Sequence, residues 1–120
     1  MSDTYQLGSK ADTMVDLGTA PRAEFQSYGK TIEVNHGLKG VGFPVITWRW
    51  EELPIPERDD LVRDLREWRP IERFIRTQLP DGSWAVFHCL QHPPESGRLS
   101  TRKRKIVDFS LRFTHCIRVE

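Results

Sequence analysis

The sequence predicts a mainly β (α+β) fold, an antiparallel β-sandwich or open barrel with one amphipathic flanking helix and an extended N-terminal arm. Three patterns predict it. Residues 107–119 alternate between apolar and polar side chains, as a strand with one buried face does. Residues 45–50 do the same and put Trp48 and Trp50 on one face, which we expect to be the interior. Residues 56–68 have the one convincing helical spacing.

Size and composition restrict the classes of function. At 120 residues, with 38% apolar and 29% charged residues, the chain suits one globular domain. The formal net charge of +1 gives no overall field that would attract nucleic acid or an anionic membrane. There is no apolar run of about 20 residues, and the N-terminus lacks the apolar core of a signal peptide, so we expect the protein to stay in the cytoplasm that makes it. A domain this small would gain stability by assembling.

Residues 1–30 differ from the rest, because their apolar side chains follow no helical or strand period. We predict an extended arm or edge segment here, and residues 31–120 as the β-sandwich domain. The apolar residues are too many for a solvated tail, so the segment packs either on its own domain or on a neighbouring subunit. The residues expected at such a partner interface are Tyr5, Leu7, Met14, Leu17, Phe25 and Tyr28.

In the first half of the domain, residues 31–34 form a short β-prone run, and the glycines at 37, 40 and 42 predict a turn or irregular loop. After the tryptophan strand, Pro56 suits the first turn of a helix. Leu61, Leu65 and Trp68 give that helix one apolar stripe, and Pro70 ends it.

In the second half, residues 74–79 and 84–90 flank a turn centred on Asp81 and Gly82, which predicts a β-hairpin. Residues 93–97 break the second strand, and a polar loop leads to the last one. In that last strand we expect an apolar face interrupted by His115, with Thr114 and Cys116 on the opposite face. The apolar face consists of Val107, Phe109, Leu111, Phe113, Ile117 and Val119.

The sequence predicts no metal site, no cofactor and no enzymatic activity. His88, Cys89, His92, His115 and Cys116 lie in late strands, but neighbours in a strand face opposite sides, and no zinc-binding motif is present. Without a secretion signal, the two cysteines are expected to be reduced. The acidic residues around the helix start fit capping and the helix dipole better than a catalytic carboxylate pair, and the glycines at 37–42 lack the context of a phosphate loop.

A basic run is the best candidate for contact with another molecule. It consists of Arg102, Lys103, Arg104 and Lys105. Clustered cations can bind phosphates. No aromatic side chain is interleaved with these four as a base-stacking platform would require, so a solvated loop tip or a contact with an acidic protein surface is favoured.

Several segments, in their order, resemble small tail proteins of long-tailed bacteriophages, the tail-tube and distal-tail group. They are a strand with Thr47, Trp48 and Trp50, a helix entry at residues 53–61, the turn of residues 81–84 and a terminal strand at 109–114. The resemblance implies a virion structural protein, a β-sandwich subunit that assembles into a homo-oligomeric ring, most often a hexamer, and contacts other tail proteins. It implies a lumen through which DNA passes, no catalytic residues and no specific nucleic-acid binding. Such channels usually have an acidic lining, so the basic run is expected at a subunit contact or a ring-to-ring contact instead of the lumen.

Two hypotheses of different classes therefore follow from the sequence. The first is a structural subunit of a phage tail, in the tube, the distal tail or an adaptor ring, made in the host cytoplasm and located in the virion. The alternative is a small β-sandwich binding module that docks on protein or nucleic acid through its basic loop.

Overall fold

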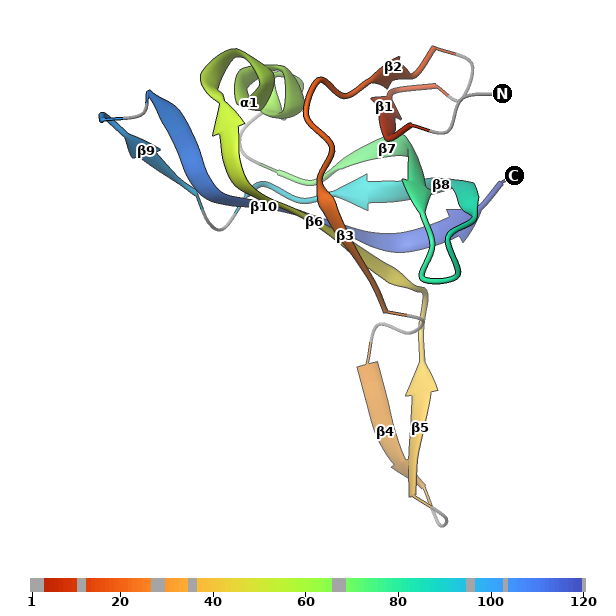
Figure 1. The fold of residues 1–120 in the computed structure, drawn as a ribbon. Coiled ribbons are helices and arrows are strands. Elements are labelled where there is room, and N and C mark those ends of the chain that lie inside the picture. Colours follow the sequence, from red (N-terminus) through yellow and green to blue (C-terminus); the bar gives the residue numbers. More distant parts are fainter. Residues whose placement is uncertain are drawn as a thin grey trace.

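The computed structural model describes residues 4–10, 13–26, 30–34, 37–65, 69–94, 97–102 and 104–119. It confirms the mainly β fold with a flanking helix (Figure 1). The elements are β1 (Gln6–Gly8), β2 (Val15–Asp16), β3 (Arg22–Gln26), β4 (Lys30–Val34), β5 (Gly37–Val41), β6 (Val45–Pro54), α1 (Ile55–Val62), β7 (Ile71–Gln78), β8 (Trp84–Gln91), β9 (Arg98–Ser100) and β10 (Lys105–Arg118).

Eight strands form one antiparallel sheet in the order β2-β1-β7-β8-β10-β6-β3, with β9 paired to β10. The sheet curls so that strands far apart in this order meet across the interior. The indole nitrogen of Trp48 in β6 donates a 3.0 Å hydrogen bond to the Thr77 hydroxyl in β7. The rings of Phe25 in β3 and Phe87 in β8 are centred 6.1 Å apart. The described strands therefore form an open barrel whose two edges are β2 and β3.

Both tryptophans of β6 face the interior, as predicted: Trp48 is 0% exposed and Trp50 4%. Trp48 packs edge to face against the ring of Phe113, with centroids 4.8 Å apart. The predicted β7–β8 hairpin is confirmed, and Gln78 pairs with Trp84 at the ends of its turn. The core also includes Leu7, Ile46, Leu53, Leu61, Ile75, Ala85, Cys89, Ile106, Phe109, Leu111 and Cys116.

The last strand departs from the predicted alternation near its start, where Ile106 is buried in place of Val107, and again at His115. This residue has a φ of +54°, and the pairing of β10 with β8 shifts register there. Such a bulge adds a residue and exchanges the faces of everything that follows it. Cys116 is therefore in the core at 2% exposed, while Ile117 and Val119, expected inside, are 49% and 50% exposed. Thr114, expected outside, is also buried.

The helix is shorter than the predicted 56–68. It begins at Ile55, with Pro56 in its first turn, and ends at Val62. The Leu65 amide bonds to the Val62 carbonyl, three residues back, which marks a tight turn in place of a continued α-helix. Leu65 still reaches the interior, but from the turn. Trp68 lies outside the described residues.

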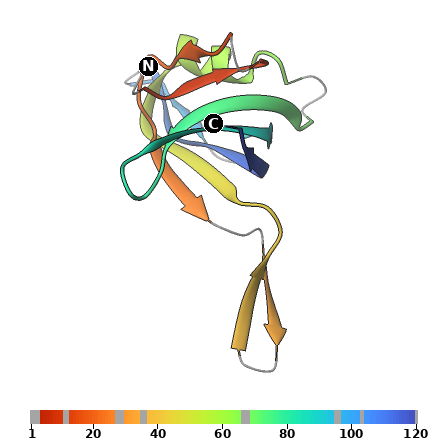
Figure 2. The same cartoon turned by 90° about the vertical axis from the view of Figure 1, so that its right-hand side faces the viewer.

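Residues 1–30 contribute edge strands, one of the two alternatives left open by the sequence. β1 pairs with β7, and β3 pairs with β6. The glycine-rich segment after residue 36, expected as a turn or loop, instead forms β5, which pairs with β4. These two strands make a separate two-stranded sheet that projects from the barrel (Figures 1 and 2).

Candidate functional site: an interaction surface

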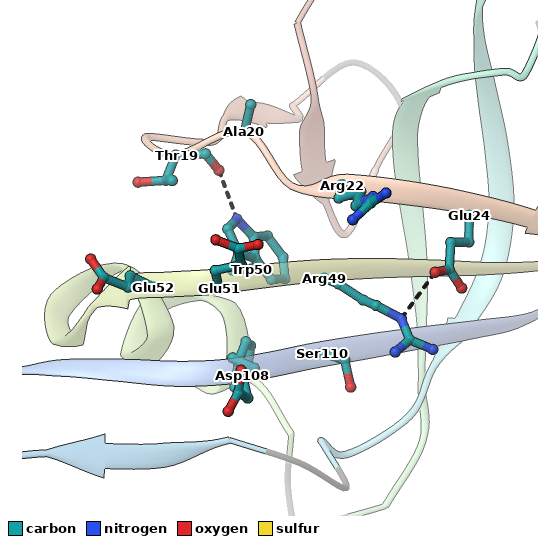
Figure 3. Close-up of a pocket in the computed structure, with 11 residues that line it drawn as sticks. Thr19, Ala20, Arg22, Glu24, Arg49, Trp50, Glu51, Glu52, Asp108 and Ser110 are labelled. Carbon is teal, nitrogen blue, oxygen red and sulfur yellow. Dashed lines mark hydrogen bonds and ion pairs between the residues drawn. The ribbon is translucent and has the colours of Figure 1, made fainter.

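A groove of about 600 Å³ crosses the outer face of β3, β6 and β10. Figure 3 shows Arg22, Arg49 and Glu24 gathered toward one end of it and Glu51 and Glu52 toward the other. Trp50 forms part of its wall, and its indole nitrogen donates a 2.9 Å hydrogen bond to the Thr19 carbonyl. The remaining lining residues are Thr19, Ala20, Asp108, Phe109 and Ser110.

The acidic residues of this groove face outward because β6 and β10 each contain two consecutive outward-facing residues. On β6 the inward residues Trp50 and Leu53 are separated by two outward ones, and on β10 Ile106 and Phe109 are separated in the same way. Both strands interrupt their inward–outward alternation at the same level, so their pairing continues in unchanged register. Asp108, within this step, has a φ of +54°. The step turns Glu51, Glu52 and Asp108 outward together.

The charges of the groove are largely neutralised within this chain. The guanidinium of Arg49 lies 3.3 Å from the Glu24 carboxylate, and the Lys105 ammonium lies 3.7 Å from Glu52. These groups are exposed, so each ion pair stabilises the fold by at most about 1 kcal/mol. A surface of mixed sign suits another protein better than a polyanion such as nucleic acid.

The histidines and cysteines considered as metal ligands are distributed over separate contacts. Within the described residues no group of three or more His, Cys, Asp or Glu side chains is placed to hold a metal ion. His92 and His115 both hydrogen-bond the Thr114 hydroxyl, at 2.6 and 3.1 Å. Cys89 and Cys116 are free and buried, and their thiols donate to the carbonyls of Arg73 and Phe113 at 3.6 and 3.5 Å. The neighbouring Cys116 thiol and burial raise the pKa of Cys89.

The predicted interface residues of the N-terminal segment pack on the protein's own interior. Leu7 is a core residue at 6% exposed, which removes it as a partner contact. Leu17 and Phe25 are partly buried against the same core, and Met14 is half-buried. Tyr5 stacks edge on against Trp48 and Trp84, with centroids 5.7 and 4.9 Å away, and partial burial raises its pKa. Tyr28 lies outside the described residues.

The basic run lies at the turn between β9 and β10. The polar loop expected at its start contains a strand, since Arg98–Ser100 pairs with Lys105–Val107. Arg102 and Arg104 are exposed, and Lys105 forms the ion pair with Glu52. Lys103 lies outside the described residues. Arg102 and Arg104 thus lie at the exposed tip of the β9–β10 hairpin and Lys105 at the start of β10, and the contact of this run with another molecule stays a prediction.

The sequence analysis missed two buried arginines of β7. Arg73 is 5% exposed and forms a 2.7 Å ion pair with Asp64. Arg76 is 7% exposed, and its Nε, like the Nε of Arg73, has no hydrogen-bond partner among the described residues. The sequence contains a signal for one of them: residues three apart in a strand face opposite sides, so one of the two must face inward, and Arg73 lies on the same face as the core residue Ile75.

No helix in the described ranges combines the length and apolar character needed to cross a membrane.

Comparison with protein families, with curated proteins and with solved structures gives no match.

Proposed function

We propose that this protein is a structural assembly subunit, of the kind from which phage tails are built, and that it joins neighbouring copies through its projecting β4–β5 hairpin. The observation that supports this is the isolation of the hairpin: β4 and β5 pair with each other and with no other described strand. A lone two-stranded hairpin is marginally stable in water. A second chain would supply the surface that it lacks.

The point at which the hairpin leaves the barrel also suits a role in connecting subunits. The chain leaves the barrel at Gln26 and re-enters it at Val45, and these two residues are direct partners in the β3–β6 ladder. The hairpin is therefore an insertion between two paired strands, and removing it leaves their ladder intact. It accounts for the long shape of the molecule, which measures 53 by 32 by 31 Å (Figure 2).

The finer proposal is a homo-oligomeric ring, most often a hexamer, in the tail of a virion assembled in the host cytoplasm. Its partners would be further tail proteins, and DNA would pass through its lumen. The support for this is the resemblance described above, together with a hairpin and an open edge strand that can extend one sheet toward the next subunit. Contacts from a projecting element of one copy to a different surface of the next produce closed rings or open filaments.

Removing the hairpin tests the proposal. Residues 28–41 are replaced by Asn-Gly, which leaves Phe43 and Pro44 in place to contact His115 and Cys116. We expect the native protein to sediment as a large closed oligomer or polymer and the shortened chain to sediment as a monomer. The near-ultraviolet circular dichroism of the buried tryptophans should not change, since the hairpin contributes no strand to the main sheet.

A native protein that sediments as a 14.0 kDa monomer at all concentrations would contradict the proposal and favour the binding module. Assembly that survives loss of the hairpin would contradict the role of the hairpin. Negative-stain electron microscopy of the assembled fraction distinguishes rings from filaments.

A further inference from the structure

The strand β3 forms an open edge of the main sheet, beside the groove described above. It pairs with β6 on one side, and no described strand pairs with it on the other (Figure 1). Its side chains alternate: Arg22, Glu24 and Gln26 are exposed, and Ala23 and Phe25 are half-buried. An edge strand presents unpaired backbone N–H and C=O groups, which can bond to a strand of another chain.

The two exposed charges of β3 have opposite signs, and only one of them is compensated within the chain. The Glu24 carboxylate lies 3.3 Å from the Arg49 guanidinium. Arg22 forms no ion pair with any described residue, and its direct partner in the β3–β6 ladder is Arg49. Like charges opposite each other in a ladder are destabilising. The cationic end of the groove, where Figure 3 shows Arg22 and Arg49, therefore has room for a further carboxylate.

Two copies of β3 supply this carboxylate to each other when they pair antiparallel about a two-fold axis. In such a pair, residues at equal distances from the axis lie opposite each other. With the axis at Ala23, Arg22 of each copy lies opposite Glu24 of the other, so opposite charges meet twice. An axis at Arg22 or at Glu24 would put a charge opposite its own copy. The charges of β3 therefore favour the register centred on Ala23.

We propose that β3 pairs in this register with β3 of a second copy, and that the contact joins two oligomers assembled through their hairpins. The inference rests on the proposed function, because one short strand buries far less than the roughly 1,200–2,000 Å² of a stable interface. It does not hold two free chains together. An oligomer presents one β3 for each subunit, so many weak contacts act at once.

The first experiment reverses the charges of β3. In Arg22→Glu both charges are negative and in Glu24→Arg both are positive, so each variant alone should assemble to half the mass of the native oligomer. Oligomers of the two variants, mixed in equal amounts, should regain the native mass, because every contact then joins opposite charges. Sedimentation velocity measures the mass. Arg112→Glu is the matched control: it reverses an exposed charge on β10, which β6 separates from the edge, and should keep the native mass.

The second experiment tests the register in the full chain. Ala23 lies on the proposed axis, and side chains directly opposite in an antiparallel pair have Cβ atoms about 4.5–5.5 Å apart, near enough for a disulfide after a small adjustment. Ala23→Cys should therefore form a covalent dimer on mild oxidation, seen on a non-reducing gel. Gln26→Cys is the control, since this position is more exposed but not opposite its own copy, and it should cross-link at least tenfold more slowly. Cys89 and Cys116 are buried and do not interfere.

The results separate this inference from the proposed function. If Arg22→Glu keeps the native mass, if the mixed variants stay at half mass, or if Gln26→Cys cross-links as fast as Ala23→Cys, the β3 contact is overturned and the role of the hairpin is unaffected. If either charge variant is a folded monomer, β3 belongs to the contact within one oligomer and the inference is also wrong. A native protein that is a monomer, and whose Ala23→Cys variant does not cross-link, overturns both.

Discussion

The hydrogen bond between Trp48 and Thr77 connects two strands on opposite sides of the open barrel, and removing it tests whether the interior is assembled as described. The substitution Thr77→Val exchanges the hydroxyl for a methyl group of nearly the same size. The side chain is 1% exposed and the indole of Trp48 is 0% exposed, so water cannot replace the lost acceptor without opening the core. The indole N–H, which now donates at 3.0 Å, would be left buried without a partner.

A buried donor that loses its partner costs about 1–3 kcal/mol. For a domain of this size each kcal/mol lowers the unfolding midpoint by roughly 4 °C. We therefore expect Thr77→Val to lower the midpoint by about 4–12 °C. Guanidinium denaturation followed by tryptophan fluorescence should show the same loss as a lower midpoint concentration at an unchanged slope.

Thr47→Val is the matched control. Thr47 belongs to the same strand as Trp48 but is half-buried on the outer side, and the described part of the chain offers its hydroxyl no hydrogen bond. Its replacement should change stability by less than about 0.5 kcal/mol. If Thr77→Val were no more destabilising than Thr47→Val, β6 and β7 would not face each other across one interior, and the barrel described here would be wrong.

Three further predictions concern separate parts of the fold. Gly97 has a φ of +122°, and a Cβ there would lie 2.8 Å from a ring carbon of Phe109. Gly97→Ala should therefore lower the free energy of unfolding, measured by urea titration, by about 1–3 kcal/mol. An unchanged midpoint would contradict this geometry. Burial should keep the thiols of Cys89 and Cys116, which donate to backbone carbonyls, unreactive toward iodoacetamide at pH 8 until denaturant is added. Rapid labelling of the native protein would contradict this. Hydrogen bonds from the Ser83 hydroxyl and amide lower the pKa of Asp81. The contribution of the Asp81 carboxylate to stability is therefore complete above the pKa of the unfolded chain, about 3.9, and is lost as the pH falls through the lower pKa of the folded protein. NMR titration of the Asp81 carboxyl should give a pKa below that of the unfolded chain.

The parts of the fold that the sequence predicted are those with a strong local cause. The alternation around Trp48 and Trp50 fixes which face of β6 is buried. The turn between β7 and β8 is specified by Asp81, whose carboxylate accepts the Ser83 amide at 2.9 Å, and by Gly82 at a φ of +89°. Local chemistry of this kind acts regardless of what the rest of the chain does.

The errors come from causes that are not local. His115 adopts a positive φ, which no residue type there signals, and this single angle moves Cys116 inward and Ile117 and Val119 outward. The helix ends at Val62, and in the turn that follows it Asp64 binds Arg73 of β7 at 2.7 Å. Periodicity cannot show a bulge at a residue other than glycine, or an ion pair between two elements.

The two buried arginines of β7 differ in how their charge is compensated within the chain. Of the two arginines on β7, Arg73 has a counter-ion in Asp64, and its cost of burial is offset within the chain. Arg76 has no such partner among the described residues, although a methionine or leucine would fill the same space without a charge to desolvate. We therefore expect Arg76→Met to leave the free energy of unfolding unchanged or to raise it, and Arg73→Met to lower it, because only the second change leaves a partner carboxylate without its counter-ion. Urea denaturation of the two variants measures the difference, and a loss of stability in Arg76→Met as large as that in Arg73→Met would contradict this reasoning.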